Sequence, residues 1–192
     1  MNLLALERTV VRVDVVDSSS GGVTRQRHLD RALGTVLDQV VDSVRHSRYA
    51  DAECFRRDDG DSATLLVGAQ VPGAWIASDL MRELTIALHD VNRPVHDDYR
   101  LRLRIAVDHG PTVMDPPHVN GEAVVTAARL VDAPALRRFV ADERDVDFGL
   151  IVSDRFHRDV VLAGERGLGL VRFEPVEVVV KDFRQPAWLQ VG

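Results

Sequence analysis

The sequence predicts an α+β fold: a ferredoxin-like βαββαβ two-layer sandwich, followed by further helices and strands. Apolar residues alternate with a period of two in several short segments, as in strands. In two longer segments they recur every three or four positions, as in helices. The order is strand, helix, strand, strand, helix, strand, which is typical of this architecture. With 192 residues, the chain is expected to form one domain over 1–192.

The first strand and helix come from the N-terminal quarter. Within Thr9 to Ser20, valines at 11, 13 and 15 predict a strand that breaks into a loop of serines and glycines. A helix is predicted over roughly 23–46 because its leucines and valines form one stripe. A hairpin follows, with strands at 53–57 and 63–67 and an Asp-rich turn between them.

The second half of the core begins at Pro72 and Gly73, which open a helix that stops at Pro94. The clearest alternation in the chain predicts a strand at 101–107, and three prolines predict a loop over 111–120. The predicted C-terminal additions are helices at 121–131, 133–142 and 154–163, a strand at 150–153, and a closing antiparallel pair at 171–180 and 187–191.

Composition excludes several classes of protein. The formal charge of −6 argues against a nucleic-acid partner. No apolar run reaches the roughly 20 residues that span a bilayer, and the first ten residues lack a secretion signal, so no membrane partner is expected. Cys54 is the single cysteine, which rules out an internal disulfide and favours a cytoplasmic location.

Two aspartates are the candidate centre of chemistry. Asp14 stands near the end of a core strand, where a carboxylate is costly unless a cation or hydrogen bonds compensate for its burial. Asp61 stands in the hairpin turn, and would be its neighbour if the two elements lie side by side. The loop Ser18 to Gly22 leads into a helix N-terminus and offers amides to phosphates. We interpret these features as a divalent metal site facing a nucleotide.

Structural interpretations compete with this one. Asp14 could cap the loop beyond its strand, and Asp61 could belong to a solvated turn with Asp58 and Asp59. Arg129 could be a partner in a surface salt bridge.

Four motifs, in order, carry a resemblance to a known family. They are Asp14-Val15-Val16-Asp17-Ser18-Ser19, Gly60-Asp61, the strand from Arg104 to Gly110, and the helix from Gly121 to Leu130. Over about Thr9 to Val180 the chain resembles the class III nucleotidyl cyclases, especially the stand-alone cyclase-like domains of high-GC bacteria.

The resemblance implies the roles of individual residues. Asp14, the Val15 carbonyl and Asp61 would hold Mg²⁺ or Mn²⁺, and the loop with Ser18 and Ser19 would bind the phosphates of a nucleoside triphosphate. Arg129 would stabilise phosphoryl charge during catalysis. Arg57 and His118 stand at the positions that read the base, and differ from the family's usual residues. The family's site lies between two catalytic domains, which implies a homodimer here.

Two departures from the family pattern bear on activity. The family's transition-state Asn is Val125 here, which has no hydrogen-bonding side chain, and Asp17 puts a negative charge where glycine is usual. Two functions are therefore expected. The first is a divergent cyclase that forms a cyclic nucleotide and pyrophosphate; the second is a catalytically silent homodimer that serves as a nucleotide sensor or an interaction module.

Overall fold

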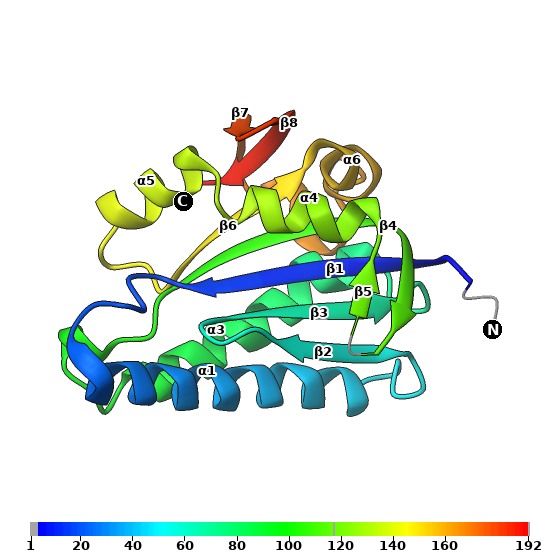
Figure 1. Ribbon diagram of the computed structural model, residues 1–192. Coiled ribbons are helices and arrows are strands. Elements are labelled where there is room, and N and C mark those ends of the chain that lie inside the picture. Colours follow the sequence, from blue (N-terminus) through cyan, green and yellow to red (C-terminus); the bar gives the residue numbers. More distant parts are fainter. Residues whose placement is uncertain (1–3, 117, 192) are drawn as a thin grey trace.

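The computed structural model describes residues 4–116 and 118–191. In these residues eight strands form one sheet, in the order β2-β3-β1-β4-β6-β8-β7 with β5 paired to β4 (Figure 1). The strands are β1 (Leu6–Val15), β2 (Cys54–Asp58), β3 (Ser62–Gly68), β4 (Leu103–Asp115), β5 (His118–Asn120), β6 (Phe148–Ser153), β7 (Phe173–Val180) and β8 (Phe183–Gln190). The helical elements are α1 (Gly22–Arg45), α2 (Gly73–Trp75), η1 (Ile76–Leu80), α3 (Met81–Asn92), η2 (Asp97–Tyr99), α4 (Glu122–Leu130), α5 (Pro134–Asp142), α6 (Asp154–Phe156), η3 (His157–Val161) and η4 (Glu165–Leu170).

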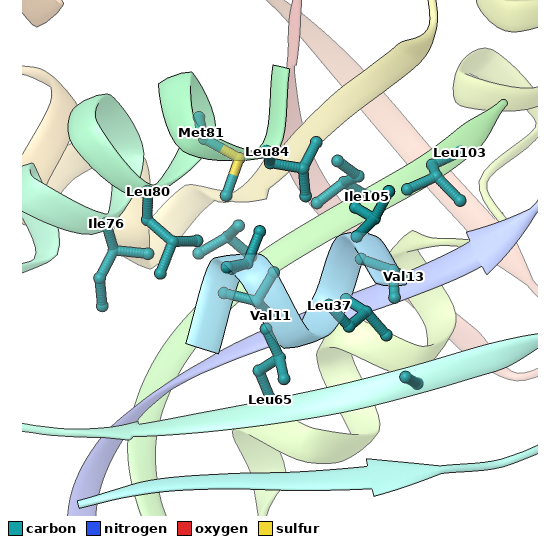
Figure 2. Close-up of a cluster of buried hydrophobic side chains, with 14 of the residues drawn as sticks. Val11, Val13, Leu37, Leu65, Ile76, Leu80, Met81, Leu84, Leu103 and Ile105 are labelled. Atoms are coloured by element: carbon teal, nitrogen blue, oxygen red, sulfur yellow. The ribbon is translucent and has the colours of Figure 1, made fainter. Parts of the chain in front are cut away.

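The ferredoxin-like core is confirmed. β1 pairs antiparallel with both β3 and β4, and β2 forms a hairpin with β3. α1 and α3 pack together on one face of this sheet (Figure 1). Their apolar stripes meet the strands in one large buried cluster. Figure 2 labels ten of its residues: Val11, Val13, Leu37, Leu65, Ile76, Leu80, Met81, Leu84, Leu103 and Ile105.

The longest helix, α1, is amphipathic. Its eight buried residues recur at helical spacing and face the sheet: Leu29, Ala32, Leu33, Val36, Leu37, Val40, Val41 and Val44. Polar residues cover its other side. Among the described residues, no helix combines the length and the apolar character needed to cross a membrane.

The C-terminal additions cover the second face of the sheet. α4 and α5 pack on strands β1, β4 and β6 through a second buried cluster that includes Val10, Ala106 and Ile151. β4 and β6 run parallel, so the chain must cross over between them, and α4 and α5 form that crossover. Helices therefore lie on both faces of the complete sheet, and two layers describe only the βαββαβ core (Figure 1).

The prediction of a loop after the strand at 101–107 is wrong. We expected residues 111–120 to be a loop, but β4 continues to Asp115 and pairs with β5. Pro111 lies opposite Glu7, and Arg8 donates to the Thr112 carbonyl (3.0 Å) and hydroxyl (2.9 Å). Pairing with the start of β1 thus outweighs the low strand propensity of proline.

A glycine ends this hairpin for a steric reason. Gly121 has φ 143°, and a Cβ there would lie 2.5 Å from the Pro111 carbonyl oxygen. Only glycine fits where the chain turns into α4.

Candidate functional site

An ion pair between neighbouring strands lies at the centre of the site. Val11, Val13 and Val15 of β1 point into the core below α1, so Asp14 points to the opposite face, where α4 lies. Its register partner on β4 is Arg104. The Arg104 Nε donates to Asp14 Oδ2 at 3.0 Å, and Nη2 donates to the same oxygen. Both side chains are largely buried.

The surroundings of Asp14 make its charge costly. Burial raises the pKa of this carboxyl group, and the hydrogen bond and charge of Arg104 only partly offset that effect. The charges of Asp61 and Asp132 raise the pKa further. The pKa of Asp14 is therefore raised overall, because the effect of burial exceeds that of Arg104.

Asp61 joins this group from the hairpin turn between β2 and β3. The Val15 amide donates to the Asp61 carbonyl oxygen at 2.9 Å, so the end of β1 lies directly beside the turn. The Ser18 hydroxyl donates to the Asp61 carboxylate. Gly60 supplies the left-handed backbone of the turn, with φ 73°. Asp14, Val15, Asp61 and Ser18, which the sequence predicts to act together, therefore lie in one place.

The donor set fits one kind of metal site. No group of three or more His, Cys, Asp or Glu side chains suited to a metal occurs in residues 4–116 and 118–191. Mg²⁺ typically uses one or two protein carboxylates and takes further oxygens from substrate phosphates and water. Two aspartates at the end of β1 suit an ion that arrives with phosphates; they do not suit a closed structural site.

The loop between β1 and α1 has an unusual backbone. Asp17, Gly21 and Gly22 have positive φ of 52°, 76° and 76°, and the Ser20 amide and hydroxyl both donate to the Asp17 carbonyl. Asp17 occupies a left-handed position, which explains how aspartate can stand where the resembling family has glycine. Ser19 is exposed. The first turn of α1 has neither an acidic residue nor a side-chain cap, so its amides face the loop side uncompensated.

Arg57 lies near this end of the sheet but is already paired. It donates to Asp59 Oδ2 from Nη2 at 3.0 Å, and Arg12 donates to the same oxygen at 2.7 Å. Although desolvation raises the pKa of Asp59, hydrogen bonds from Arg12 and Arg57 bring it below its ordinary value. Arg12 also reaches Ser62, the register partner of Asp14, at 2.6 Å.

His118 lies at the other end of β1. It is an exposed residue of β5, in the hairpin that β4 forms after Thr112. Thr112 pairs with Leu6, eight residues along β1 from Asp14, or roughly 26 Å of strand. A single chain therefore does not bring His118 to the two aspartates.

Two residues of α4, Arg129 and Val125, were also expected to bear on the site. Arg129 is half-buried near the C-terminal end of α4, and the charge of Asp132, just beyond that end, acts on Asp14. Among the described residues, no carboxylate forms an ion pair with Arg129. Val125 is 55% exposed on the same helix.

Two arginines of the site were not predicted to act there. Arg104 lies in the strand motif from Arg104 to Gly110, and Arg12 alternates with the valines of the first strand; neither residue is predicted from the sequence to take part in the site. The available signal was the strand period: Arg12 and Asp14 on β1, and Arg102 and Arg104 flanking the start of β4, share the face opposite the valines.

Comparisons with known proteins identify the fold. No protein-family model and no curated protein matches the sequence. A solved adenylate/guanylate cyclase/hydrolase from Silicibacter pomeroyi is 17% identical, with a TM-score of 0.61 and 98% of each chain covered. The guanylate cyclase domain of RhGC from Catenaria anguillulae, in complex with GTP, is 14% identical, with a TM-score of 0.56, covering 97% of this chain and 96% of that one.

A third structure adds a dimeric example. It is the non-canonical dimeric guanylyl cyclase domain of the RhoGC fusion protein from the aquatic fungus Blastocladiella emersonii, at 14% identity and TM-score 0.59, with 97% of each chain covered. The chain thus has the fold of adenylate and guanylate cyclase catalytic domains, as the resemblance implied.

Proposed function

We propose that this chain, which has the fold of nucleotidyl cyclase catalytic domains, binds a nucleoside triphosphate with Mg²⁺ or Mn²⁺ at the end of β1. The observation that carries the proposal is the convergence of Asp14, Asp61 and the β1–α1 loop, which the Val15 and Ser18 hydrogen bonds hold together. Asp14 and Asp61 would hold the metal, with the Val15 carbonyl beside them. The fold neighbour from Catenaria anguillulae, solved with GTP, supports a nucleotide as the ligand.

Each part of the chain has a defined task in this proposal. A divalent ion held by the two aspartates would activate the attacking oxygen and neutralise the leaving phosphates. The loop amides and the first turn of α1, with Ser18 and Ser19, bind phosphate oxygens. Arg104, which donates to Asp14, would compete with a metal ion for that carboxylate, and its guanidinium is close enough to the site to offer donors to phosphates.

The reaction that this arrangement serves is cyclisation. The ribose 3′-oxygen attacks the α-phosphorus and gives its proton to water, while the bond from that phosphorus to the oxygen that bridges it to the β-phosphorus breaks and the electron pair stays on the departing pyrophosphate. The products are a 3′,5′-cyclic nucleotide and pyrophosphate. Arg129 would stabilise the charge that develops on the phosphoryl oxygens.

A second copy of the chain completes the site. His118 lies at the far end of β1 from Asp14, so in a single chain it cannot act on a nucleotide bound there. In a twofold homodimer each copy contributes the same patch, and two equivalent sites form, with Arg57, His118 and Arg129 facing the partner's aspartates. Arg57 and His118 favour a base other than adenine.

A silent homodimer, acting as a nucleotide sensor or an interaction module, is the alternative function. The observation that favours it is Val125, which is exposed on α4 and offers no hydrogen bond to a ribose. The loss of one orienting donor typically lowers a rate by about 10²–10³. We therefore expect nucleotide binding to be intact and turnover to be slow. For either function, Cys54 as the only cysteine favours the cytoplasm as the location.

The test is incubation of the purified chain with each nucleoside triphosphate and Mn²⁺, with assays for pyrophosphate and cyclic nucleotide. Nucleotide binding is measured in parallel by calorimetry. Asp14→Asn and Asp61→Asn are the site variants, and the exposed Asp142→Asn on α5 is their control.

The outcomes separate the two functions. Product that disappears in both site variants, but not in the control, supports the cyclase. Metal-dependent binding without product supports the sensor. If no triphosphate binds in the presence of Mn²⁺, the proposal is wrong in both forms.

A further inference from the structure

A large cleft lies beside the proposed nucleotide site and is lined by arginines. Its volume is about 1010 Å³, and it opens between the β1–α1 loop, the start of β4 and the C-terminal half of α5. Six arginines line it, against four aspartates: Arg25, Arg100, Arg102, Arg104, Arg137 and Arg144. We call it the arginine cleft. Only Arg104 also belongs to the group around Asp14.

Half of these arginines are paired with acids. Arg100 pairs with Asp147, Arg104 with Asp14 and Arg137 with Asp132. Within the described residues, Arg25, Arg102 and Arg144 have no carboxylate at ion-pair distance. The three unpaired guanidinium groups are thus the part of the cleft that an incoming anion could engage without breaking an existing pair.

Backbone carbonyls hold two of these groups in place without neutralising them. Arg102 donates from Nε to the Val146 carbonyl at 3.0 Å, and from Nη2 to the carbonyls of Val140 at 2.6 Å and Glu143 at 2.7 Å. Its Nη1 is not used in these bonds. Arg25 donates to the carbonyls of Asp98 at 2.6 Å and Asp17 at 2.7 Å. The guanidinium groups of Arg25 and Arg102 are therefore held in place before any ligand binds, and their remaining N–H groups could donate to it.

The guanidinium groups also repel one another. Burial lowers the pKa of Arg102, and the nearby charges of Arg100 and Arg144 lower it further, against the opposing effect of Asp147 and Asp17. A ligand with several negative charges would relieve this repulsion at more than one arginine at once.

We propose that the arginine cleft is a metal-independent binding site for linear polyphosphate, either pyrophosphate or a longer chain, beside the proposed nucleotide site, with which it shares Arg104 and the β1–α1 loop. Guanidinium forks match phosphate oxygens in pairs, and linked phosphates place several charges on one molecule, which suits the unpaired Arg25, Arg102 and Arg144. The polyphosphate could be pyrophosphate released in a nucleotide reaction or a free chain from solution. Binding at this site requires neither nucleotide nor divalent cation, so it does not depend on the proposed function.

The test is calorimetric titration of the full chain with pyrophosphate and with tripolyphosphate, in EDTA to exclude metal. We expect one polyphosphate per chain, with binding that weakens as salt is added. Arg144→Gln should weaken it about tenfold, the effect of losing a charge-assisted hydrogen bond. Arg144 is exposed and forms no side-chain hydrogen bond within the described residues, so its loss should leave folding intact.

The matched control is Arg138→Gln, which removes the same charge from an exposed position of α5 outside the cleft. It should bind polyphosphate like the parent protein. Asp14→Asn, which removes a proposed metal ligand, should not weaken binding in EDTA. Tighter binding of pyrophosphate would indicate the released product as the source, and tighter binding of tripolyphosphate a free chain.

Four results would overturn the proposal. They are no binding below about 1 mM, equal binding of orthophosphate and polyphosphate, equal weakening by Arg144→Gln and Arg138→Gln, and binding that appears only with Mn²⁺ and is lost in Asp14→Asn. The last result would place the polyphosphate in the nucleotide site. Failure of nucleotide binding with polyphosphate binding intact would instead count against the proposed function alone.

Discussion

Arg104 of β4 donates two hydrogen bonds to a single carboxylate oxygen of Asp14 on β1. The two residues are register partners in neighbouring antiparallel strands, so the pairing is built into the sheet. The guanidinium thus provides positive charge beside the carboxylate that we propose as a metal ligand. Metal and Arg104 should therefore compete for Asp14.

Removal of the Arg104 guanidinium should change the binding of metal and of nucleotide in opposite directions. In Arg104→Gln, Mn²⁺ binding to the nucleotide-free protein should tighten by up to about tenfold, while nucleoside triphosphate binding should weaken by a similar factor. Electron paramagnetic resonance of free Mn²⁺ measures the metal binding, and calorimetry measures the nucleotide binding. Arg100→Gln, which breaks the pair with Asp147 instead, is the control for Mn²⁺ binding. Unchanged Mn²⁺ affinity in Arg104→Gln would rule out the competition.

Restoring an amide at position 125 should raise turnover. Val125 is 55% exposed on α4, so Val125→Asn should fold like the parent protein. If an orienting hydrogen bond is what the site lacks, pyrophosphate release in the presence of Mn²⁺ should rise by about 10²–10³. Val125→Ala, which adds no donor, should leave the rate unchanged. Equal rates in the two variants would show that the missing amide does not limit the reaction.

Asp14 should cost stability at neutral pH. Its pKa is raised in the folded state, mainly by burial, so folding favours the protonated form. The stability that protonated Asp14 contributes is complete below the unfolded pKa near 3.8 and is lost as the pH rises through the higher folded pKa. Asp14→Asn, which cannot ionise, should therefore lose this part of the fall in the free energy of unfolding as the pH rises. Urea unfolding from pH 3 to 7 measures this, and an unchanged pH dependence in the variant would contradict it.

The buried pair between Asp108 and Arg155 should be important for folding. Asp108 is fully buried and accepts from Arg155 at 2.5 and 3.1 Å and from the Ser153 hydroxyl at 2.5 Å. Asp108→Asn leaves the guanidinium without its anion, which should cost about 3–5 kcal/mol. Thermal and urea unfolding should show this loss, and Asp142→Asn at an exposed position of α5 should show almost none. A small effect would mean that water replaces the carboxylate.

The core elements and the two candidate metal ligands could be predicted because their signals are local. The valines of β1 and the stripe of α1 carry their own periodicity. Asp61 follows the glycine of a hairpin turn, and Asp14 belongs to a motif that spans only six residues. Elements of this kind depend on near neighbours in the chain, so the order βαββαβ and the position of each aspartate within it followed from the sequence alone.

Only the tertiary structure decided the contacts between residues that lie far apart in the chain. Arg104 reaches Asp14 across 90 residues. Arg102 reaches the Val140 carbonyl of α5 across 38 residues, and the Glu143 carbonyl just beyond that helix across 41. Pro111 lies in a strand because β1, more than 100 residues earlier, pairs with that segment. Strand register and helix docking set these contacts, and both depend on burial of the whole core. A sequence pattern of a few residues therefore does not predict them.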